Sequence, residues 1–222
     1  MENEEKEEND EEEKQNKSKK TKKAKNEHDI KAILLGESGV GKTNLINVTI
    51  GHSFTENTST TFSNSFVEKI FEINNIKYNI KLWDTIGQEK YRPLTKIFFK
   101  DSKIIILVYD KSIKKSFDEL KYWVSEVKNA LGDDIIIGIA GNKYDLEEDE
   151  NDVDENKVRE FAKSINAKFK MVSAKTNGKG FINFLQQLLI DYIKMYEGPI
   201  KDKNKKIVLN EKKIKKKKKK FC

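Results

Sequence analysis

The sequence predicts an α/β domain built on a six-stranded, mostly parallel sheet with helices on both faces. Short apolar or alternating runs, each the length of a strand, take turns along the chain with segments whose apolar residues recur at helical spacing. Strands that alternate with helices in this way form a parallel sheet covered on both sides. One pair of runs is separated by only two residues, so we expect one antiparallel strand at the edge.

The strands are predicted from apolar content and from the residues that interrupt it. Three runs are nearly continuously apolar, as expected for strands that are buried on both faces. Asn74 and Asn75 separate the second run from the third, and this pair favours a tight hairpin turn. The six predicted strands cover residues 30–35, 66–73, 76–83, 103–110, 135–140 and 168–172.

The helices are predicted from apolar periodicity and from capping residues. Ser116 precedes two acidic residues and is expected to cap a helix. Residues 51–62 are polar without helical period and predict a loop, and the acidic residues 147–155 predict a solvated loop. The first predicted helix covers residues 44–48. The later helices are predicted at about 116–124, 154–165 and 178–195.

Charge divides the 222 residues into three parts. Residues 1–13 hold nine acids against one lysine, and residues 197–222 hold twelve lysines against three acids. Residues 28–196 carry 24 basic and 24 acidic residues, so the formal net charge of +7 belongs to the ends. We therefore expect a disordered, charged extension over residues 1–27, one domain over 28–196 and a lysine-rich tail over 197–222. The neutral body argues against nucleic-acid binding.

Cysteine usage and hydropathy indicate a cytoplasmic protein. The single cysteine, Cys222, excludes a disulfide within the chain, which suits a reducing compartment. The acidic start lacks the apolar core of a secretory signal, and no apolar run approaches the roughly 20 residues of a membrane span.

Residues 36–43 fit the phosphate-binding pattern G-x-x-x-x-G-K-[ST], between the first strand and the first helix. Glycines let the loop amides turn toward a phosphate at the positive end of the helix dipole. Lys42 is expected to reach the outer phosphates, and the Thr43 hydroxyl to ligate Mg²⁺. The alternative is an ordinary glycine turn in an unrelated α/β protein. The residues expected to contact nucleotide here are Gly36, Ser38, Gly39, Val40, Gly41, Lys42, Thr43 and Asn44.

Three further motifs follow predicted strands, at the edge where α/β folds bind ligands. Asp84 can hold a water on Mg²⁺, and the amide of Gly87 can meet a γ-phosphate oxygen. Asp145 can accept two hydrogen bonds from guanine, whereas adenine would leave this carboxylate unpaired. A polar turn is the alternative for that stretch. The residues expected around the base are Asn142, Lys143, Asp145, Ser173, Ala174 and Lys175, with Asn142 also tying this loop to the phosphate loop.

These motifs, in this order, resemble the small GTPases of the Ras superfamily, and the Rab family most closely. The resemblance covers about residues 29–196, and its Rab character comes from residues 80–85, 88–92, 98–100 and 107–110. It implies a P-loop NTPase of the small G domain type that binds GTP or GDP with Mg²⁺. It further implies slow hydrolysis, and switching between two states as a monomer.

The resemblance also implies roles for three residues. Thr61 is expected to ligate Mg²⁺ only when the γ-phosphate is present, and Phe54 to pack on the guanine edge. Gln88 is the expected catalytic residue, which positions the attacking water. Effectors, an exchange factor and an activating protein are expected to bind through residues 54–67 and 84–100.

Two regions depart from the Rab pattern. The segment 61–66 does not contain the residues that Rab proteins usually have after the threonine at position 61. Ile86 stands where an alanine is usual. Cys222 is the last residue and does not form a C-a-a-X box. A single prenyl chain on Cys222, with the lysine tail against an anionic leaflet, is nevertheless a sound anchor to a cytosolic membrane face. A solvated tail or a nuclear localisation signal is the alternative.

Three functional hypotheses remain at this point. The first is a Rab-type, GTP-hydrolysing switch in vesicle or membrane traffic. The second is an adaptor that holds guanine nucleotide with little turnover, and the third is a soluble GTPase of the superfamily outside membrane traffic.

Overall fold

A computed structural model describes residues 27–56, 66–85, 96–176 and 178–198. Its strands are β1 (Glu27–Leu35), β2 (Phe66–Ile73), β3 (Ile76–Trp83), β4 (Ile104–Asp110), β5 (Ile136–Asn142) and β6 (Lys168–Met171). Its helices are α2 (Lys42–Thr49), the short 3₁₀ helix η2 (Lys96–Phe98), α4 (Lys114–Asp118), α5 (Leu120–Leu131), α6 (Glu155–Ser164) and α7 (Gly178–Tyr196).

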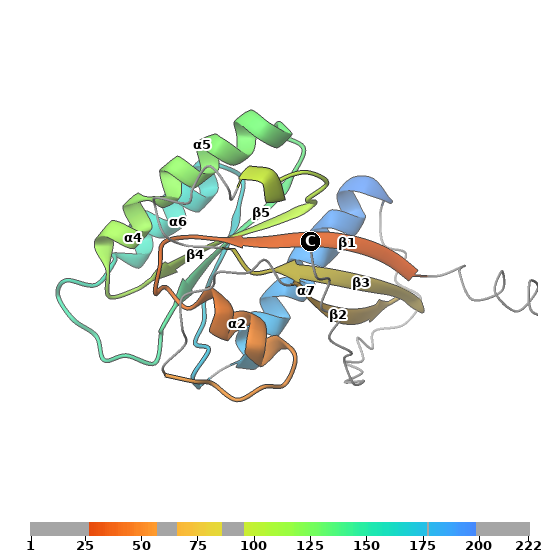
Figure 1. Ribbon diagram of the computed structural model, residues 1–222. Coiled ribbons are helices and arrows are strands. Elements are labelled where there is room, and N and C mark those ends of the chain that lie inside the picture. The colour runs from red at the N-terminus through yellow and green to blue at the C-terminus, as the bar shows by residue number, and fades with distance from the viewer. Residues whose placement is uncertain (1–26, 57–65, 86–95, 177, 199–222) are drawn as a thin grey trace, which may run out of the picture.

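The strands form one sheet in the order β2-β3-β1-β4-β5-β6 (Figure 1). Only β2 and β3 pair antiparallel, and the other neighbours are parallel. Asn74 and Asn75 join the antiparallel pair with φ angles of 53° and 63°, the left-handed conformation that a tight hairpin requires. The predicted six-stranded sheet with one antiparallel edge strand is therefore confirmed.

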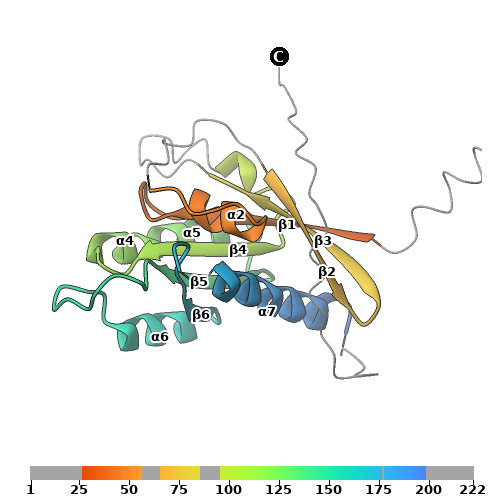
Figure 2. The ribbon, with the colours of Figure 1, turned by 90° about the horizontal axis from the view of Figure 1, so that it is seen from below.

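Two apolar cores lie on opposite faces of the sheet, because side chains along each strand alternate between the faces. One core packs α2 and α7 against Ile30, Leu34 and Ile80. The other packs α5 and α6 against Ile33 and Leu107. Figure 2 shows α7 running along one side of the strands, with α2 beside its first turns. Among the described residues, no helix is both long and apolar enough to cross a bilayer.

The helix that follows β4 differs from the prediction. Ser116 lies inside α4 rather than at its N-terminus, and its side chain is buried. The Ser116 hydroxyl donates to the Ile113 carbonyl at 2.7 Å and accepts from the Asp110 amide at 3.0 Å. It therefore ties the helix to the end of β4 instead of capping it. Asp154 caps α6, since its side chain accepts from the Asn156 amide at 2.9 Å.

The carboxyl ends of the parallel strands bring the predicted loops to one edge of the sheet. β1 leads into the phosphate loop, β3 into Asp84, β5 ends at Asn142, and β6 leads into Ser173. Helix α7 runs from this edge to the opposite one. It starts beside Val48 of α2, and the hydroxyl of Tyr196 in its last turn donates to the Asp134 carbonyl.

Candidate nucleotide-binding site

The phosphate loop has a backbone that only glycine tolerates at two positions. Gly36 and Gly41 have φ angles of 150° and 94°, in the region that other residues rarely adopt. A Cβ atom on Gly36 would lie 2.1 Å from the Val108 carbonyl oxygen, and one on Gly41 would lie 2.3 Å from Asn142 Nδ2. The loop is therefore pressed against β4 and β5 and cannot carry side chains there.

Lys42 is the first residue of α2, and its side chain turns back into the loop. Its ammonium donates to the carbonyls of Gly36 and Glu37, both at 2.8 Å. Burial lowers the pKa of Lys42 to about 8, against the opposing pull of Asp84 and Glu37. A buried cation enclosed by a turn of backbone suits an anionic group such as a phosphate.

Thr43 and Asp84 meet beside this lysine. Thr43 Oγ1 donates to Asp84 Oδ2 at 2.7 Å, which joins the start of α2 to the end of β3. The next residue, Thr85, donates from its hydroxyl to the Leu34 carbonyl at 2.5 Å and so fixes Asp84 against β1. A hydroxyl and a carboxylate oxygen held together fit the oxygen ligands that Mg²⁺ prefers.

Asn142 connects three of the predicted motifs. Its side-chain nitrogen donates to the Val40 carbonyl at 2.8 Å, and its side-chain oxygen accepts from the Ala174 amide at 3.2 Å. The expected contact between Asn142 and the phosphate loop is thus confirmed. Asp145 is joined to the same group, because its carboxylate accepts from the Ser173 hydroxyl at 2.5 Å.

The remaining predicted residues lie around this arrangement. Lys175 Nζ lies 5.9 Å from the ring centre of Phe54 and 3.3 Å from the carboxylate of Glu56. The side chain of Asn44 donates to the Thr55 carbonyl at 3.0 Å, which holds the segment that carries Phe54 against α2. These contacts place the predicted aromatic beside the residues expected around the base.

Comparisons with known proteins agree with this geometry. Residues 31–191, well over half of the chain, match the sequence model described as Ras family. The chain belongs to the Ras family. It is 38% identical over 167 residues to the Ras-related protein Rab-21 of Mus musculus, which covers 75% of this chain and 72% of that protein. It is 37% identical over 147 residues to the Ras-related protein Rab-22A of Homo sapiens, which covers 66% of this chain and 75% of that protein.

These matches confirm the predicted membership of the Rab group within the Ras family. Ras-family proteins of this kind are GTP-binding, GTP-hydrolysing switches, and the Rab proteins act in membrane traffic. The chain is accordingly a Rab-type GTPase of membrane traffic, and the predictions of a GTPase and of the small G domain fold hold.

Part of the predicted Ras-family site lies outside the described residues. This applies to the switch residues Thr61, Gly87 and Gln88, to Ile86, and to Cys222 at the chain end. The remaining predicted residues are described, and their loops meet at one edge of the sheet. Ser38 is exposed in the phosphate loop, whereas Val40 is buried beneath it.

The structure also brings in side chains that the sequence reasoning missed. Asp110 ends β4 and pairs with Lys143 at 2.6 Å, and Lys111 pairs with Asp152 at 2.8 Å. Asp152 belongs to the acidic stretch predicted to be solvated, yet its side chain is only 17% exposed. No sequence pattern marks Lys111 or Asp152, because they meet only after the chain folds.

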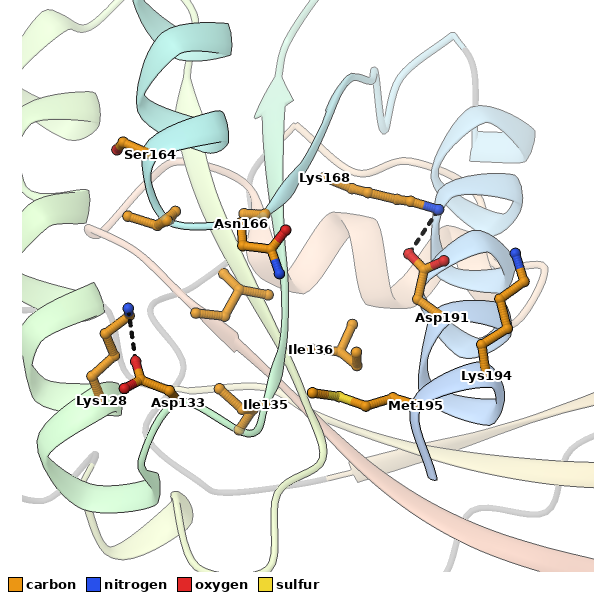
Figure 3. Close-up of a pocket in the computed structure, with 13 residues that line it drawn as sticks. Lys128, Asp133, Ile135, Ile136, Ser164, Asn166, Lys168, Asp191, Lys194 and Met195 are labelled. Atoms are coloured by element: carbon orange, nitrogen blue, oxygen red, sulfur yellow. Dashed lines mark ion pairs between the residues drawn. The ribbon is translucent and has the colours of Figure 1, made fainter. Parts of the chain in front are cut away.

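A cavity of about 670 Å³ lies at the other edge of the Ras-family domain (Figure 3). Isoleucines around the start of β5 line it, together with Met195 of α7. Two ion pairs flank it, one between Lys128 and Asp133 and one between Lys168 and Asp191. None of the predicted site residues lines this cavity. Its place at the amino ends of the strands is opposite to where α/β folds bind their ligands.

Proposed function

We propose that GTP and Mg²⁺ bind at the carboxyl edge of the sheet, in the domain formed by residues 28–196. The observation that carries the proposal is the 2.7 Å hydrogen bond between Thr43 and Asp84. It holds two hard oxygen atoms beside Lys42, whose buried ammonium is matched to a phosphate. Thr61 is the proposed third contributor to the metal site. Mg²⁺ would be held by Thr43, Thr61 and Asp84, and it would supply positive charge that offsets the negative charge of the phosphates.

The phosphates and the base are bound by separate loops in this proposal. Amides of residues 39–43 donate to the phosphate oxygens, and Lys42 supplies the opposite charge. Asp145 accepts from the two donors on the guanine edge, and the Ala174 amide donates to the guanine carbonyl. Asn142 keeps both loops in register through its hydrogen bond to Val40. Phe54 packs against the edge of the base.

Switching follows from two contacts that exist only with a γ-phosphate. Thr61 and Gly87 bind the γ-phosphate side of the site, and hydrolysis releases both loops. Gln88 orients the attacking water. Catalysis of this kind depends on positioning and electrostatics, so the unaided rate is expected at about 10⁻⁴–10⁻³ s⁻¹, as for Ras itself.

The proposal is tested by single-turnover hydrolysis of bound GTP. Gln88→Leu is expected to slow hydrolysis at least about tenfold while GTP affinity stays unchanged. Gln15→Leu, in the N-terminal extension, is the matched control and should hydrolyse at the wild-type rate. Equal rates in all three proteins would remove Gln88 from the mechanism. A wild type that binds GTP without any turnover would instead favour the adaptor hypothesis.

Partners are proposed to read the state of residues 54–67 and 84–100. The described part of this surface holds a partly exposed aromatic cluster. Trp83 lies between Phe66 and Phe98, with ring centres 5.0 Å and 6.0 Å away. Rigid aromatic side chains contribute strongly to protein interfaces, so this cluster is the proposed centre of the effector surface. Partner binding to GTP-loaded but not GDP-loaded protein is the expected result.

The lysine-rich tail is proposed to attach the GTPase to the cytosolic face of an intracellular membrane. Each lysine near an anionic leaflet contributes about 1 kcal/mol, and one prenyl chain on Cys222 would add the second signal that stable anchoring needs. The test is the mass of the C-terminal peptide from protein purified from its own cells. A prenyl mass that disappears in Cys222→Ser is expected. An unmodified Cys222 in both membrane and cytosol fractions would overturn the anchor.

A further inference from the structure

The loop that carries Lys143 and Asp145 is held at both ends by two consecutive residues, Asp110 at the end of β4 and Lys111 directly after it. Asp110 and Lys111 are both buried, with exposed fractions of 1% and 5%. One of them contacts the first part of the loop, and the other contacts its last part. Neither belongs to the phosphate or base motifs.

At the first end, Asp110 holds the side chain of Lys143. The carboxylate of Asp110 lies 2.6 Å from Lys143 Nζ, and its other oxygen accepts from the amide and hydroxyl of Ser112. Lys143 itself has a φ angle of 65°, a left-handed conformation that is disfavoured for any residue with a Cβ atom. The ion pair with Asp110 therefore stabilises a conformation that the backbone alone disfavours.

At the other end, Lys111 contacts the last residues of the loop, just before α6. Its ammonium lies 2.8 Å from Asp152 Oδ2 and donates to the Glu147 carbonyl at 3.1 Å. Its own carbonyl accepts from the Val153 amide at 2.8 Å, while its amide donates to the Asn142 carbonyl at 3.1 Å. One residue thus bonds to the strand before the loop and to the loop at its far end.

Asp152 is fixed in turn by its own loop. Its carboxylate accepts from the Asp149 amide at 3.3 Å, and its amide donates to the Asp149 carbonyl at 2.9 Å. The hydrogen bond from Lys111 lowers the pKa of Asp152, which favours the ionised carboxylate that the ion pair requires. Because Lys111 is almost fully buried, salt screens this pair much less than it screens a surface pair.

We propose that the Lys111–Asp152 ion pair clamps the loop of residues 143–153 and thereby positions Asp145 for the guanine base. The proposal rests on the proposed function of Asp145. Lys111 and Asp152 are positioning residues: they need not touch the nucleotide, and they act by limiting the movement of the loop that does. An unclamped loop releases guanine nucleotide sooner, because Asp145 then holds its two hydrogen bonds less firmly.

The test compares release of GDP from the full-length wild type with release from Asp152→Asn and from Lys111→Met. Each variant is expected to release GDP about three to ten times faster, which corresponds to loss of part of one charge-assisted hydrogen bond. Glu150→Gln is the matched control, because it removes the same charge from an exposed side chain of the same loop. It is expected to release GDP at the wild-type rate. Equal acceleration in Glu150→Gln would overturn the proposal and assign the effect to loop charge.

A second ligand separates positioning from general loosening. Inosine diphosphate lacks the exocyclic amine of guanine, so Asp145 can accept only one hydrogen bond from it. Asp152→Asn is therefore expected to speed the release of inosine diphosphate less than that of GDP. An equal effect on both ligands would show a merely structural role and overturn the proposal.

The double variant Lys111→Met/Asp152→Asn guards against a folding defect. Each single variant leaves a buried charge or dipole without its partner, which lowers stability more than loss of both partners. The double variant is expected to melt nearer the wild type yet release GDP as fast as the single variants. Wild-type release from a folded double variant would overturn the clamp. A wild type that itself fails to retain GDP would instead reject the proposed function, which keeps the two failures distinct.

Discussion

The side-chain nitrogen of Asn142 donates a 2.8 Å hydrogen bond to the carbonyl oxygen of Val40, across 102 positions of the chain. The same side chain accepts from the Ala174 amide. One buried amide therefore joins the end of β5 to the phosphate loop and to the loop after β6. A carboxylate of the same shape could accept from Ala174 but could not donate to Val40.

Asn142→Asp is accordingly expected to release GDP at least about tenfold faster than the wild type, since a buried acceptor loses its donor and faces another oxygen. The measurement is displacement of a fluorescent GDP analogue by excess GDP. Asn166→Asp makes the same change at an exposed site and should leave the rate unchanged. Wild-type release from Asn142→Asp would mean that the two loops hold together without this bond.

The Thr43 hydroxyl gives a prediction about metal removal. In the wild type, chelation of Mg²⁺ with EDTA is expected to speed GDP release at least about tenfold, the scale typical of disturbed metal sites. Thr43→Ala should release GDP quickly even with Mg²⁺ present and respond little to EDTA. Thr43→Ser keeps a hydroxyl near Asp84 and should recover the wild-type response. A strong EDTA response in Thr43→Ala would exclude this hydroxyl as a ligand.

Two glycines of the phosphate loop form a matched pair for stability. Gly36 and Gly39 both have positive φ angles, but a Cβ on Gly36 would meet the Val108 carbonyl at 2.1 Å, whereas one on Gly39 meets open space. Gly39→Ala is expected to lose about 1–2 kcal/mol of unfolding free energy from backbone strain alone. Gly36→Ala should lose clearly more, because crowding adds to the strain. Chemical denaturation of nucleotide-free protein measures both, and equal losses would show that β4 yields to the added atom.

Tyr78 gives a prediction that changes with pH. Its buried hydroxyl donates to Glu197 at 2.7 Å, and burial together with this carboxylate raises its pKa well above the ordinary value of 10.0. At pH 7, Tyr78→Phe is expected to lose about 1 kcal/mol, or about 2–4 °C in melting temperature. A raised pKa means that the folded state binds more protons than the unfolded state, so this stabilisation falls as pH rises above 10.

The difference in melting temperature between the wild type and Tyr78→Phe should therefore shrink in alkali. Tyr144→Phe removes an exposed hydroxyl and is the control, with no change in melting temperature expected. If the difference in melting temperature stayed constant from pH 7 to pH 11, the hydrogen bond to Glu197 would not raise the pKa of Tyr78, and the prediction would be wrong.

Most of the fold could be predicted from the sequence because local chemistry decides it. The limits of β2 and β3 follow from alternation and from the two asparagines of the turn, and those of β4 from its continuous apolar run. Ser116 was the exception. Its neighbours favour a helix cap, but the hydroxyl is buried and bonds to the end of β4, a contact that only the packed structure provides.

The candidate site divides in the same way. The phosphate loop and the loop expected to bind the base are each marked by a short, contiguous motif. Lys42, Asn142 and Asp145 could therefore be predicted from the sequence. Lys111 and Asp152 lie 41 positions apart and have no such motif, and acidic residues in a polar stretch are normally solvated. Their pairing depends on where β4 and the loop before α6 come together.

Helix α7 has a consequence for how this GTPase responds to salt. Its 19 residues give it a length of about 28 Å, from the turn after Lys175 to the contact between Glu197 and His28. The lysine-rich tail follows that far end. The Debye length in physiological salt is about 8 Å. The electric field of charges at the far end of α7 is therefore largely screened at the other end, where the nucleotide site lies. We therefore expect ionic strength to change the proposed attachment of the tail to a charged membrane without acting on the nucleotide site through the tail.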